Sequence, residues 1–147
     1  MDFVNQVDKY YMNKLINVKN ILTSIKNGYS QNKKIVFCKK NEFNLKILFL
    51  LYKEGLIVDY KLEFDYLKIK LRYYNNKPLI YDIIMIYKSS LKKFFSYEEI
   101  KKFYRKYDLF FVSTSYGIIS SNELFKFFSL KKKIGGQLLF GLHLMKL

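Results

Sequence analysis

The chain has no alanine and no tryptophan, and it carries a single cysteine, a single histidine and a single proline. With only Cys38, an internal disulfide and any cysteine-based metal cluster are excluded. With only His143, the chain lacks most of the raw material for a histidine metal site or for serine–histidine–aspartate catalysis. No uncharged apolar run approaches the roughly 18 residues that cross a bilayer. We therefore expect no metal, no cofactor, no small-molecule substrate and no membrane span.

Carboxylates are scarce relative to ammonium groups. The chain has 27 lysines and arginines against 12 aspartates and glutamates, which gives a formal net charge of +15. An excess this large favours a polyanionic partner, either nucleic acid or an anionic membrane surface. The length of 147 residues suits about one domain or two very small lobes.

Arginine is also nearly absent, since only Arg72 and Arg105 occur and lysine supplies the other positive charges. Phosphate binding does not require this bias, because arginine is the better bidentate phosphate ligand. An AT-rich gene accounts for it, and organelle genomes are often AT-rich. Met1–Tyr11 contains Asp2 and Asp8 but neither arginine nor serine, unlike a transit peptide or a secretory signal. We therefore expect a mitochondrial protein that is encoded in the organelle, with a plastid-type organelle as the less favoured alternative.

Hydrophobic periodicity changes along the first half of the chain. Apolar residues at helical spacing predict a helix over residues 14–26, which Asn27-Gly28 ends. After Gly55 the period becomes two, as in half-exposed strands. The other predicted elements are the strand Ile35–Cys38, a helix that is capped by Asn41 and ends at Gly55, the strands Ile57–Glu63 and Leu67–Tyr73, a turn at Asn75-Asn76 and the strand Pro78–Ile86. These elements predict an α-β-α-β-β lobe over residues 1–87, with residues 1–13 as an extension.

The second half has a different pattern, in which short helices join strands. Ser96 to Glu99 is a capping box that predicts a helix to about Tyr104, and Ser120 to Glu123 offers a second one. The predicted strands are Leu109–Val112 and Gln137–Leu144. We therefore expect an α+β fold in which a mostly β, RNA-binding lobe over residues 88–147 packs against the first lobe.

Three adjacent hydroxyl residues, Ser113, Thr114 and Ser115, leave the strand Leu109–Val112 and meet Gly117. In one interpretation the hydroxyls satisfy the backbone of their own turn. In the other they contact ribose hydroxyls, phosphates and base edges of RNA. A nucleophilic serine is disfavoured, because the Gly-x-Ser-x-Gly pattern is missing and no histidine lies near in sequence.

Two further features could contact RNA. Gly135 and Gly136, just before Gln137, form either a plain turn or a place where backbone N–H groups approach phosphate. Several polar or basic positions are either solvated loops or phosphate contacts, namely Lys33, Lys88, Ser89, Lys92 and Lys131. Cys38 and His143 are interpreted as packing residues.

Several segments together resemble one family. Lys53-Glu54-Gly55-Leu56-Ile57 and the preceding Ile21-Leu22-Thr23 are similar to the N-terminal half of ribosomal protein eight of the small subunit. Val112-Ser113-Thr114-Ser115-x-Gly117 matches the signature of that family, and Gly135-Gly136 matches its closing glycine pair. The chain departs from the family pattern at Lys106 and Asp108, where glycines are usual, and at Gln137, where an acidic residue is usual.

The resemblance implies a structural protein of the small ribosomal subunit that binds the central domain of its RNA and supports assembly. By resemblance, Ser113, Thr114, Ser115 and Gly117 meet a distorted internal loop of that RNA, with Gly135 and Gly136 beside them and Lys88-Ser89 on a basic interlobe loop. Neighbouring ribosomal proteins are the other expected partners, and no enzymatic activity is expected. The alternatives are a basic membrane-surface protein, a non-ribosomal RNA-binding protein and a small RNA-processing enzyme.

Overall fold

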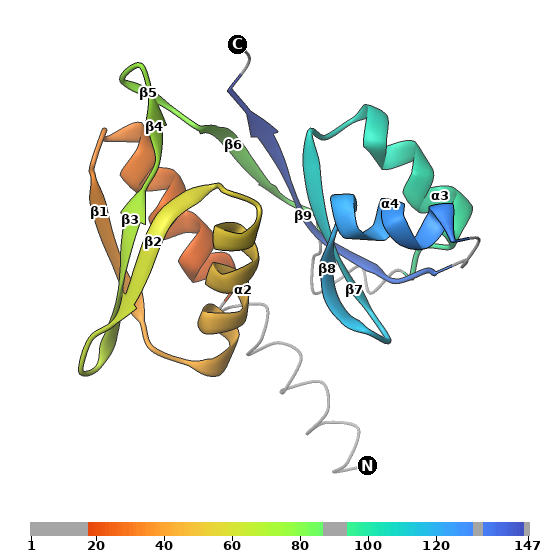
Figure 1. Ribbon diagram of the computed structural model, residues 1–147, viewed down its shortest axis with the longest axis horizontal. Helices are drawn as coiled ribbons and strands as arrows, with labels where there is room; N and C mark the ends of the chain where they lie inside the picture. Colours follow the sequence, from red (N-terminus) through yellow and green to blue (C-terminus); the bar gives the residue numbers. More distant parts are fainter. Residues whose placement is uncertain (1–17, 87–93, 131–133, 146–147) are drawn as a thin grey trace. The chain divides into compact units, whose positions relative to one another are not determined.

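Antiparallel sheets organise both units of the chain, Met1–Leu79 and Ile80–Leu147. The computed structural model describes residues 18–86, 94–130 and 134–145. Figure 1 labels the elements, which include both helices and strands in each unit. The expected α+β class is therefore confirmed.

The first unit is a three-stranded sheet with helices on one face (Figure 1). A helix over residues 18–30 comes first, followed along the chain by four regular elements. These are β1 (Ile35–Lys39), α2 (Glu42–Lys53), β2 (Ile57–Leu62) and β3 (Tyr66–Leu71), and the strands pair in the order β1-β3-β2. A short hairpin of β4 (Tyr73–Tyr74) and β5 (Lys77–Pro78) follows, with positive φ at Asn75 and Asn76 as the predicted turn requires.

Alternation along β3 explains which face of this sheet is covered. Leu67, Ile69 and Leu71 are almost fully buried, whereas the alternate residues Tyr66, Lys68 and Lys70 are more exposed. Burying each aliphatic side chain contributes about 1.5–3 kcal/mol, so this face must be covered by apolar helix residues. The fully buried residues Ile21, Ile25, Ile47 and Leu51 supply that cover.

Both predicted boundaries of α2 are confirmed. Asn41 caps the helix, since its side-chain oxygen accepts a hydrogen bond from the Asn44 N–H at 2.7 Å. Gly55 has a φ of +74°, the left-handed conformation that ends a helix at little cost only for glycine. The N-terminal cap and the C-terminal glycine therefore both follow from local chemistry.

Tyr29 ties the first helix to the sheet. Its side chain is 3% exposed, and its hydroxyl donates to the Leu56 carbonyl at 2.8 Å. The same oxygen accepts from the Arg72 N–H at 3.2 Å. Burial raises the pKa of Tyr29 to about 12, so the hydroxyl keeps its proton and remains a donor.

The end of the first helix differs from the sequence prediction. The helix continues through Gly28 to residue 30, and the positive φ occurs at Asn32 instead. A Cβ on Gly28 would lie 2.3 Å from Val36 Cγ1 and 2.9 Å from Leu71 Cδ1. Gly28 is therefore present because strands approach the helix closely, and it does not end the helix. The predicted start, residues 14–17, lies outside the described residues.

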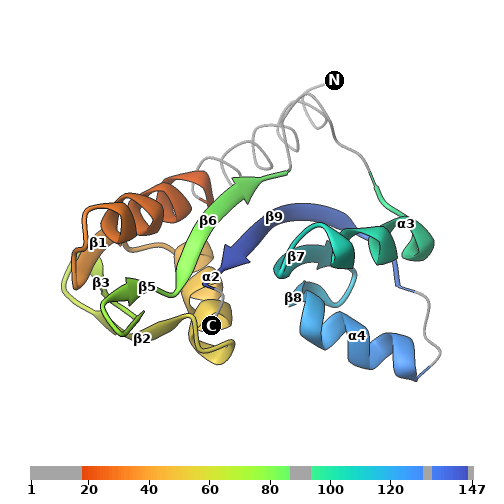
Figure 2. The same ribbon diagram turned by 90° about the horizontal axis from the view of Figure 1, so that it is seen from above.

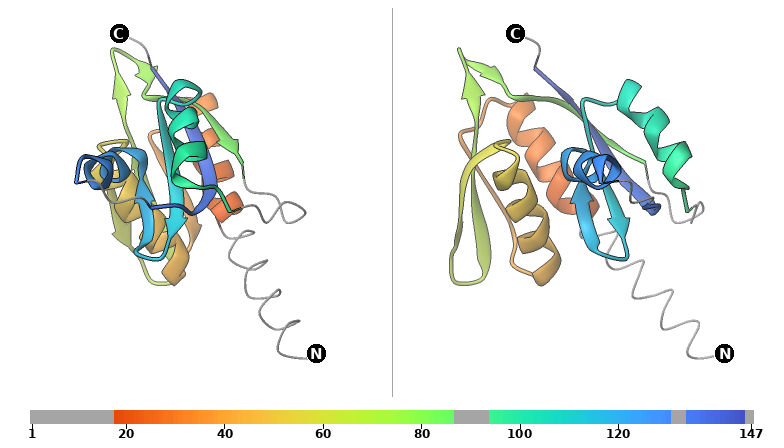
Figure 3. Two further views of the ribbon diagram at one scale, coloured as in Figure 1. Left: turned by 90° about the vertical axis from the view of Figure 1, so that its right-hand side faces the viewer. Right: turned by 45° about the vertical axis from the view of Figure 1, so that its right-hand side comes forward.

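The second unit is a four-stranded antiparallel sheet in the order β6-β9-β7-β8. Its strands are β6 (Ile80–Met85), β7 (Leu109–Thr114), β8 (Gly117–Ser120) and β9 (Gln137–Leu144). The helices α3 (Tyr97–Lys101) and α4 (Ser121–Ser129) lie on the same side of β7, as Figures 2 and 3 show. Ile100 of α3 and Leu124 of α4 belong to one buried cluster with Phe110 and Val112 of β7.

Both serine caps in this unit form. Ser96 makes a complete capping box with Glu99, and a short 3-10 helix, Lys102–Arg105, extends α3. The Ser120 side chain accepts from the Glu123 N–H at 3.3 Å at the start of α4. Between the two helices, the Tyr104 hydroxyl donates to the Ser121 carbonyl at 2.6 Å, and burial raises the pKa of Tyr104 to about 12.

The segment predicted as one strand, Pro78–Ile86, is divided between two sheets. Pro78 ends the β4–β5 hairpin, while β6 begins at Ile80 and pairs with β9. The two compact units of the chain are divided between Leu79 and Ile80. The physical reason is that the partner of β6 is the last strand of the chain, and this long-range pairing has no local sequence signal.

Candidate nucleic-acid interface

The hydroxyl motif forms the end of the β7–β8 hairpin. Thr114 pairs with Gly117, so Ser115 and Tyr116 are the two residues that connect the strands. Ser115, Tyr116 and Gly117 are all exposed. Gly117 has a φ of +97°, a conformation that strains any residue with a side chain. The sequence Ser-Tyr-Gly therefore builds a tight turn whose outer surface is open to a partner.

Thr114 is engaged by the turn itself. Its Oγ1 donates to the Gly117 carbonyl at 2.9 Å and accepts from the Tyr116 N–H at 3.1 Å. This is the local backbone role that the sequence left open for the hydroxyls. No hydrogen bond of the Ser115 hydroxyl to the described part of the chain is found, and its side chain is exposed. The three adjacent hydroxyls are thus not equivalent, because Thr114 fixes the turn and Ser115 is accessible.

Ser113 and Gln137 lie in one row across the sheet. Ser113 of β7 pairs with Ile118 of β8 on one side and with Gln137 of β9 on the other. Both polar side chains are half-buried. Because directly paired residues point to the same face of a sheet, Ser113 and Gln137 can contact a single ligand group together. The sheet therefore brings together two residues that are separated by 24 positions in the sequence.

The glycine pair has a packing role. A Cβ on Gly136 would lie 2.4 Å from the Ser113 carbonyl oxygen, and one on Gly135 would lie 2.7 Å from the Phe95 carbonyl oxygen. Phe95 and Gly136 also exchange two backbone hydrogen bonds, of 2.8 and 3.0 Å. The Gly136 N–H is therefore already paired, which leaves it unavailable to a phosphate. The pair still lies beside the motif, since it packs against the backbone of Ser113.

Sequence reasoning missed two aromatic residues at this site. Tyr116, the unassigned position of the motif, is 64% exposed and stacks on Phe127 of α4 with ring centroids 5.7 Å apart. An exposed aromatic ring next to polar groups is a surface on which a nucleic-acid base can stack. The available signal was its place in a two-residue hairpin turn, where a side chain has no core to enter.

The other predicted contacts are distributed differently. Lys33 is exposed in the first unit, in the loop between the first helix and β1. Lys88, Ser89, Lys92 and Lys131 lie outside the described residues. In the second unit, exposed positive charges are found on α3, the 3-10 helix and α4, at Lys101, Lys102, Arg105, Lys106 and Lys126. Counted over the whole sequence of this unit, residues 80–147, lysines and arginines number 12 against 5 aspartates and glutamates, and this excess attracts polyanions.

Cys38 and His143, the other side chains with reactive groups, are in contact with the packed part of the protein. Cys38 is half-buried on β1, and burial raises the pKa of its thiol to about 11, which disfavours the reactive thiolate. His143 packs near Tyr107, with ring centroids 5.6 Å apart. Within residues 18–86, 94–130 and 134–145, no group of histidine, cysteine or acidic side chains could hold a metal ion. In the same ranges no helix is both long and apolar enough to cross a bilayer.

Comparison with known proteins gives one consistent result. The sequence profile described as ribosomal protein S8 matches residues 17–143. The small ribosomal subunit protein uS8 of Ehrlichia chaffeensis is 31% identical over 129 residues, which cover 84% of this chain and 94% of that protein. The uS8 protein of Wolbachia sp. subsp. Brugia malayi is 33% identical over 110 residues, covering 72% and 78%. That of Baumannia cicadellinicola is 32% identical over 108 residues, covering 70% and 82%. The hairpin motif and the sheets, up to residue 143 of β9, lie within the matched residues, and the chain belongs to the ribosomal protein S8 family.

Proposed function

We propose that this protein binds the central domain of small-subunit ribosomal RNA through the exposed end of the β7–β8 hairpin. Membership of the family makes it a structural constituent of the small ribosomal subunit and not an enzyme, with ribosomal RNA and other small-subunit proteins as partners. The proposal adds which part of the RNA is bound and which residues bind it.

The observation that supports the proposal is that the residues of the hairpin turn have two different roles. Thr114 and Gly117 fix the turn, and this leaves the Ser115 hydroxyl and the Tyr116 ring exposed on a rigid support. Short side chains on a fixed backbone select one RNA shape, because the deep groove of an A-form helix cannot be read by side chains. Ser113 and Gln137 extend this surface along the sheet.

Positive charge supplies the part of the affinity that is independent of sequence. Lysines near the RNA release condensed counterions, so binding weakens as salt rises. Lys131 and the Lys88–Lys92 segment are proposed to contribute here, together with Lys33. Gly135 and Gly136 are proposed to shape the surface by holding Ser113 in place, and not to bind phosphate through the Gly136 N–H.

Replacing Ser115 by alanine tests the proposal. We expect Ser115→Ala to weaken binding to a central-domain RNA fragment by about 1–2 kcal/mol, because a hydrogen-bond partner in the complex is left unpaired. Ser30→Ala is the matched control, since Ser30 is an exposed serine of the first unit. Equilibrium binding at one fixed salt concentration is the measurement. Equal affinities of Ser115→Ala and the control would contradict the proposed site.

We propose a mitochondrial ribosome as the location, with the gene in the organelle. The support is the composition, in which lysine almost replaces arginine and alanine is absent. The relatives named above are bacterial proteins, and they agree with a bacterial-type small subunit. Sedimentation of the protein with small subunits from purified mitochondria is the expected result. Its recovery only with another ribosome would contradict the location.

A further inference from the structure

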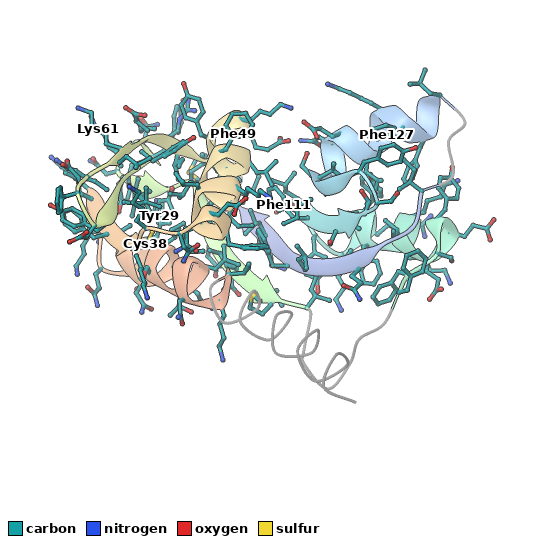
Figure 4. The ribbon with its side chains drawn as sticks, turned by 90° about the horizontal axis from the view of Figure 1, so that it is seen from below. Tyr29, Cys38, Phe49, Lys61, Phe111 and Phe127 are labelled. Atoms are coloured by element: carbon teal, nitrogen blue, oxygen red, sulfur yellow. The ribbon has the colours of Figure 1, made fainter. Side chains whose placement is uncertain are left out.

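The sheet of the first unit has one face that the helices do not cover. Side chains of β1, β2 and β3 that point away from the buried Val36, Leu67 and Ile69 lie on this face. Strand register arranges them in three rows, which we call the open face: Ile35–Lys70–Asp59, Phe37–Lys68–Lys61 and Lys39–Tyr66. Figure 4 shows the labelled Lys61 side chain extending away from the helices.

Two aromatic rings remain exposed on the open face. Phe37 is 54% exposed and Tyr66 is 43% exposed. The rings meet edge to face, with centroids 5.3 Å apart and an interplanar angle of 83°. Each ring fixes the other, so the pair is an ordered surface and not two independent side chains. Ordered, solvent-exposed rings on a sheet are what an unpaired base needs in order to stack.

The positions of the lysines on the open face destabilise the folded sheet. Lys61 and Lys68 are directly opposite each other on neighbouring strands, an arrangement of like charges that destabilises a sheet. Lys39 and Lys70 add two more positive charges, against two carboxylates: Asp59 in the first row and Glu63, whose N–H donates to the Tyr66 carbonyl at 2.9 Å at the end of the third. The Asp59 carboxylate also accepts from the Tyr60 N–H at 2.8 Å. An anion bound between the lysines would relieve their repulsion.

A hollow lies over the same residues. It has a volume of about 270 Å³ and is lined by Ile35, Asp59, Tyr60, Lys61, Lys68 and Lys70. This is close to the lower end of the volumes of small-ligand sites. Three lysines therefore converge on a concave surface next to the ring pair, which combines phosphate attraction with a place for a base.

We propose that the open face is a second RNA-binding surface that takes unpaired nucleotides. Bases stack on Phe37 and Tyr66, and phosphates lie against Lys61, Lys68 and Lys70. This surface is separate from the hairpin site and goes beyond the function proposed above. A single-stranded nucleic acid fits the face because, unlike an acidic protein or an anionic membrane, it offers both a repeated negative charge and a flat aromatic group at each step, and RNA is the nucleic acid of a ribosomal subunit.

The test uses the full chain and a fluorescent oligouridylate, a single strand with no secondary structure. Phe37→Leu keeps an apolar side chain but removes the stacking ring, and Phe49→Leu is its matched control. Phe49 is 52% exposed and lies on α2 (Figure 4). We expect Phe37→Leu to weaken oligonucleotide binding about tenfold and Phe49→Leu to leave it unchanged. Equal effects of the two substitutions would overturn the proposal.

A second pair of variants tests the charges. Lys61→Gln with Lys68→Gln removes two charges from the open face, and Lys19→Gln with Lys77→Gln removes two exposed charges elsewhere in the same unit. We expect the first pair to lower the slope of log affinity against log salt by about 1.4, since each phosphate contact contributes about 0.7 for single strands. A smaller loss is expected for the control pair. Equal slopes for both pairs would overturn the phosphate contacts.

Two further measurements separate this surface from other possibilities. Ser115→Ala should bind the oligouridylate as wild type does, so the hairpin site and the open face can fail independently. Polyglutamate should compete weakly with the oligouridylate, because it has charge but no rings. Competition by polyglutamate as strong as that by unlabelled oligouridylate would overturn the RNA assignment in favour of an acidic protein surface. Circular dichroism melting of every variant confirms that the fold is retained.

Discussion

Both units contain an antiparallel sheet, but strand β7 of the second unit and strand β1 of the first differ in how many of their sides are buried. In the second unit, the consecutive residues Phe110 and Phe111 point to opposite faces of β7, and both are fully buried. In the first unit, Val36 of β1 is buried while the next residue, Phe37, is 54% exposed. A strand such as β7, buried on both sides, can offer a partner only its end and its turn. A strand with one exposed side can offer that side, and this difference agrees with the hairpin site proposed for the second unit and the open face proposed for the first.

The largest effect should come from removing rings on the two sides of β7. We expect Phe110→Ala and Phe111→Ala each to lower the free energy of unfolding by about 3–5 kcal/mol, because a large buried ring leaves a cavity. Phe37→Ala should cost less than about 1 kcal/mol, because its ring is half in water already. Urea unfolding of the three variants measures the difference. A cost for Phe111→Ala as small as that for Phe37→Ala would break the comparison.

Substitutions at two glycines near the hairpin distinguish the cost of a steric clash from the cost of a strained backbone conformation. Gly136→Ala should destabilise the protein by about 2–3 kcal/mol, since the new Cβ would collide with the Ser113 carbonyl. Gly117→Ala should cost about 1 kcal/mol, because a Cβ there meets nothing within 4 Å and only the positive φ is strained. Thermal unfolding ranks them, and the reverse order would contradict this account of the two glycines.

The buried Tyr29 in the first unit and the partly buried Tyr104 in the second each donate a hydroxyl hydrogen bond to a backbone carbonyl, and the two should differ in importance. Tyr29→Phe leaves both the Leu56 carbonyl and the Arg72 N–H without their partner, whereas Tyr104→Phe leaves only the Ser121 carbonyl. We expect losses of about 2 and about 1 kcal/mol respectively. Equal losses would indicate that the Arg72 contact contributes nothing.

The same tyrosines predict a response to alkaline pH. Their pKa values are raised to about 12 in the folded protein, above the ordinary value of 10, so the folded state holds their protons more tightly. Their contribution to stability is complete below about pH 10 and is lost as pH rises through 12. Ultraviolet titration should show late-ionising phenols, and Tyr29→Phe and Tyr104→Phe should each remove one. Absence of a late phase in the wild-type protein would contradict the burial of both hydroxyls.

The smallest expected effect has the opposite sign. Lys61→Gln should raise the free energy of unfolding by about 0.3–0.5 kcal/mol, because it removes the repulsion with Lys68 across the β2–β3 pair. Lys77→Gln, a substitution in the β4–β5 hairpin, should change it less. Thermal unfolding at low salt measures both. A destabilised Lys61→Gln variant would show that repulsion between Lys61 and Lys68 does not lower the stability of the folded protein.

Local signals in the sequence predicted the elements but not their partners. The strand Gln137–Leu144, the Asn41 cap and the Ser96 capping box appear as predicted, because short apolar runs and capping motifs depend on neighbouring residues. The segment Pro78–Ile86 is divided because β6 pairs with β9, about 60 residues later in the chain. No residue near the segment indicates this pairing. Gly28 was misinterpreted for the same reason, since Val36 and Leu71 determine it and neither is adjacent.

The site shows the same limit. The motif Ser113–Gly117 is a local signal, and the sequence located it together with Gln137. The sequence could not separate the role of Thr114 from that of Ser115, because this depends on which hydroxyl faces the turn. The open face could not be found either, since Lys61 and Lys68 become neighbours only through the register of β2 and β3.

The hydrogen bonds of Thr114 have a consequence for how fast a complex forms. These bonds order the turn before it binds, so it does not have to fold when it meets the RNA. Association should then follow a single kinetic phase that accelerates at low ionic strength, without a slow rearrangement afterwards. Such a ready-made contact can form before competing folds of the transcript do.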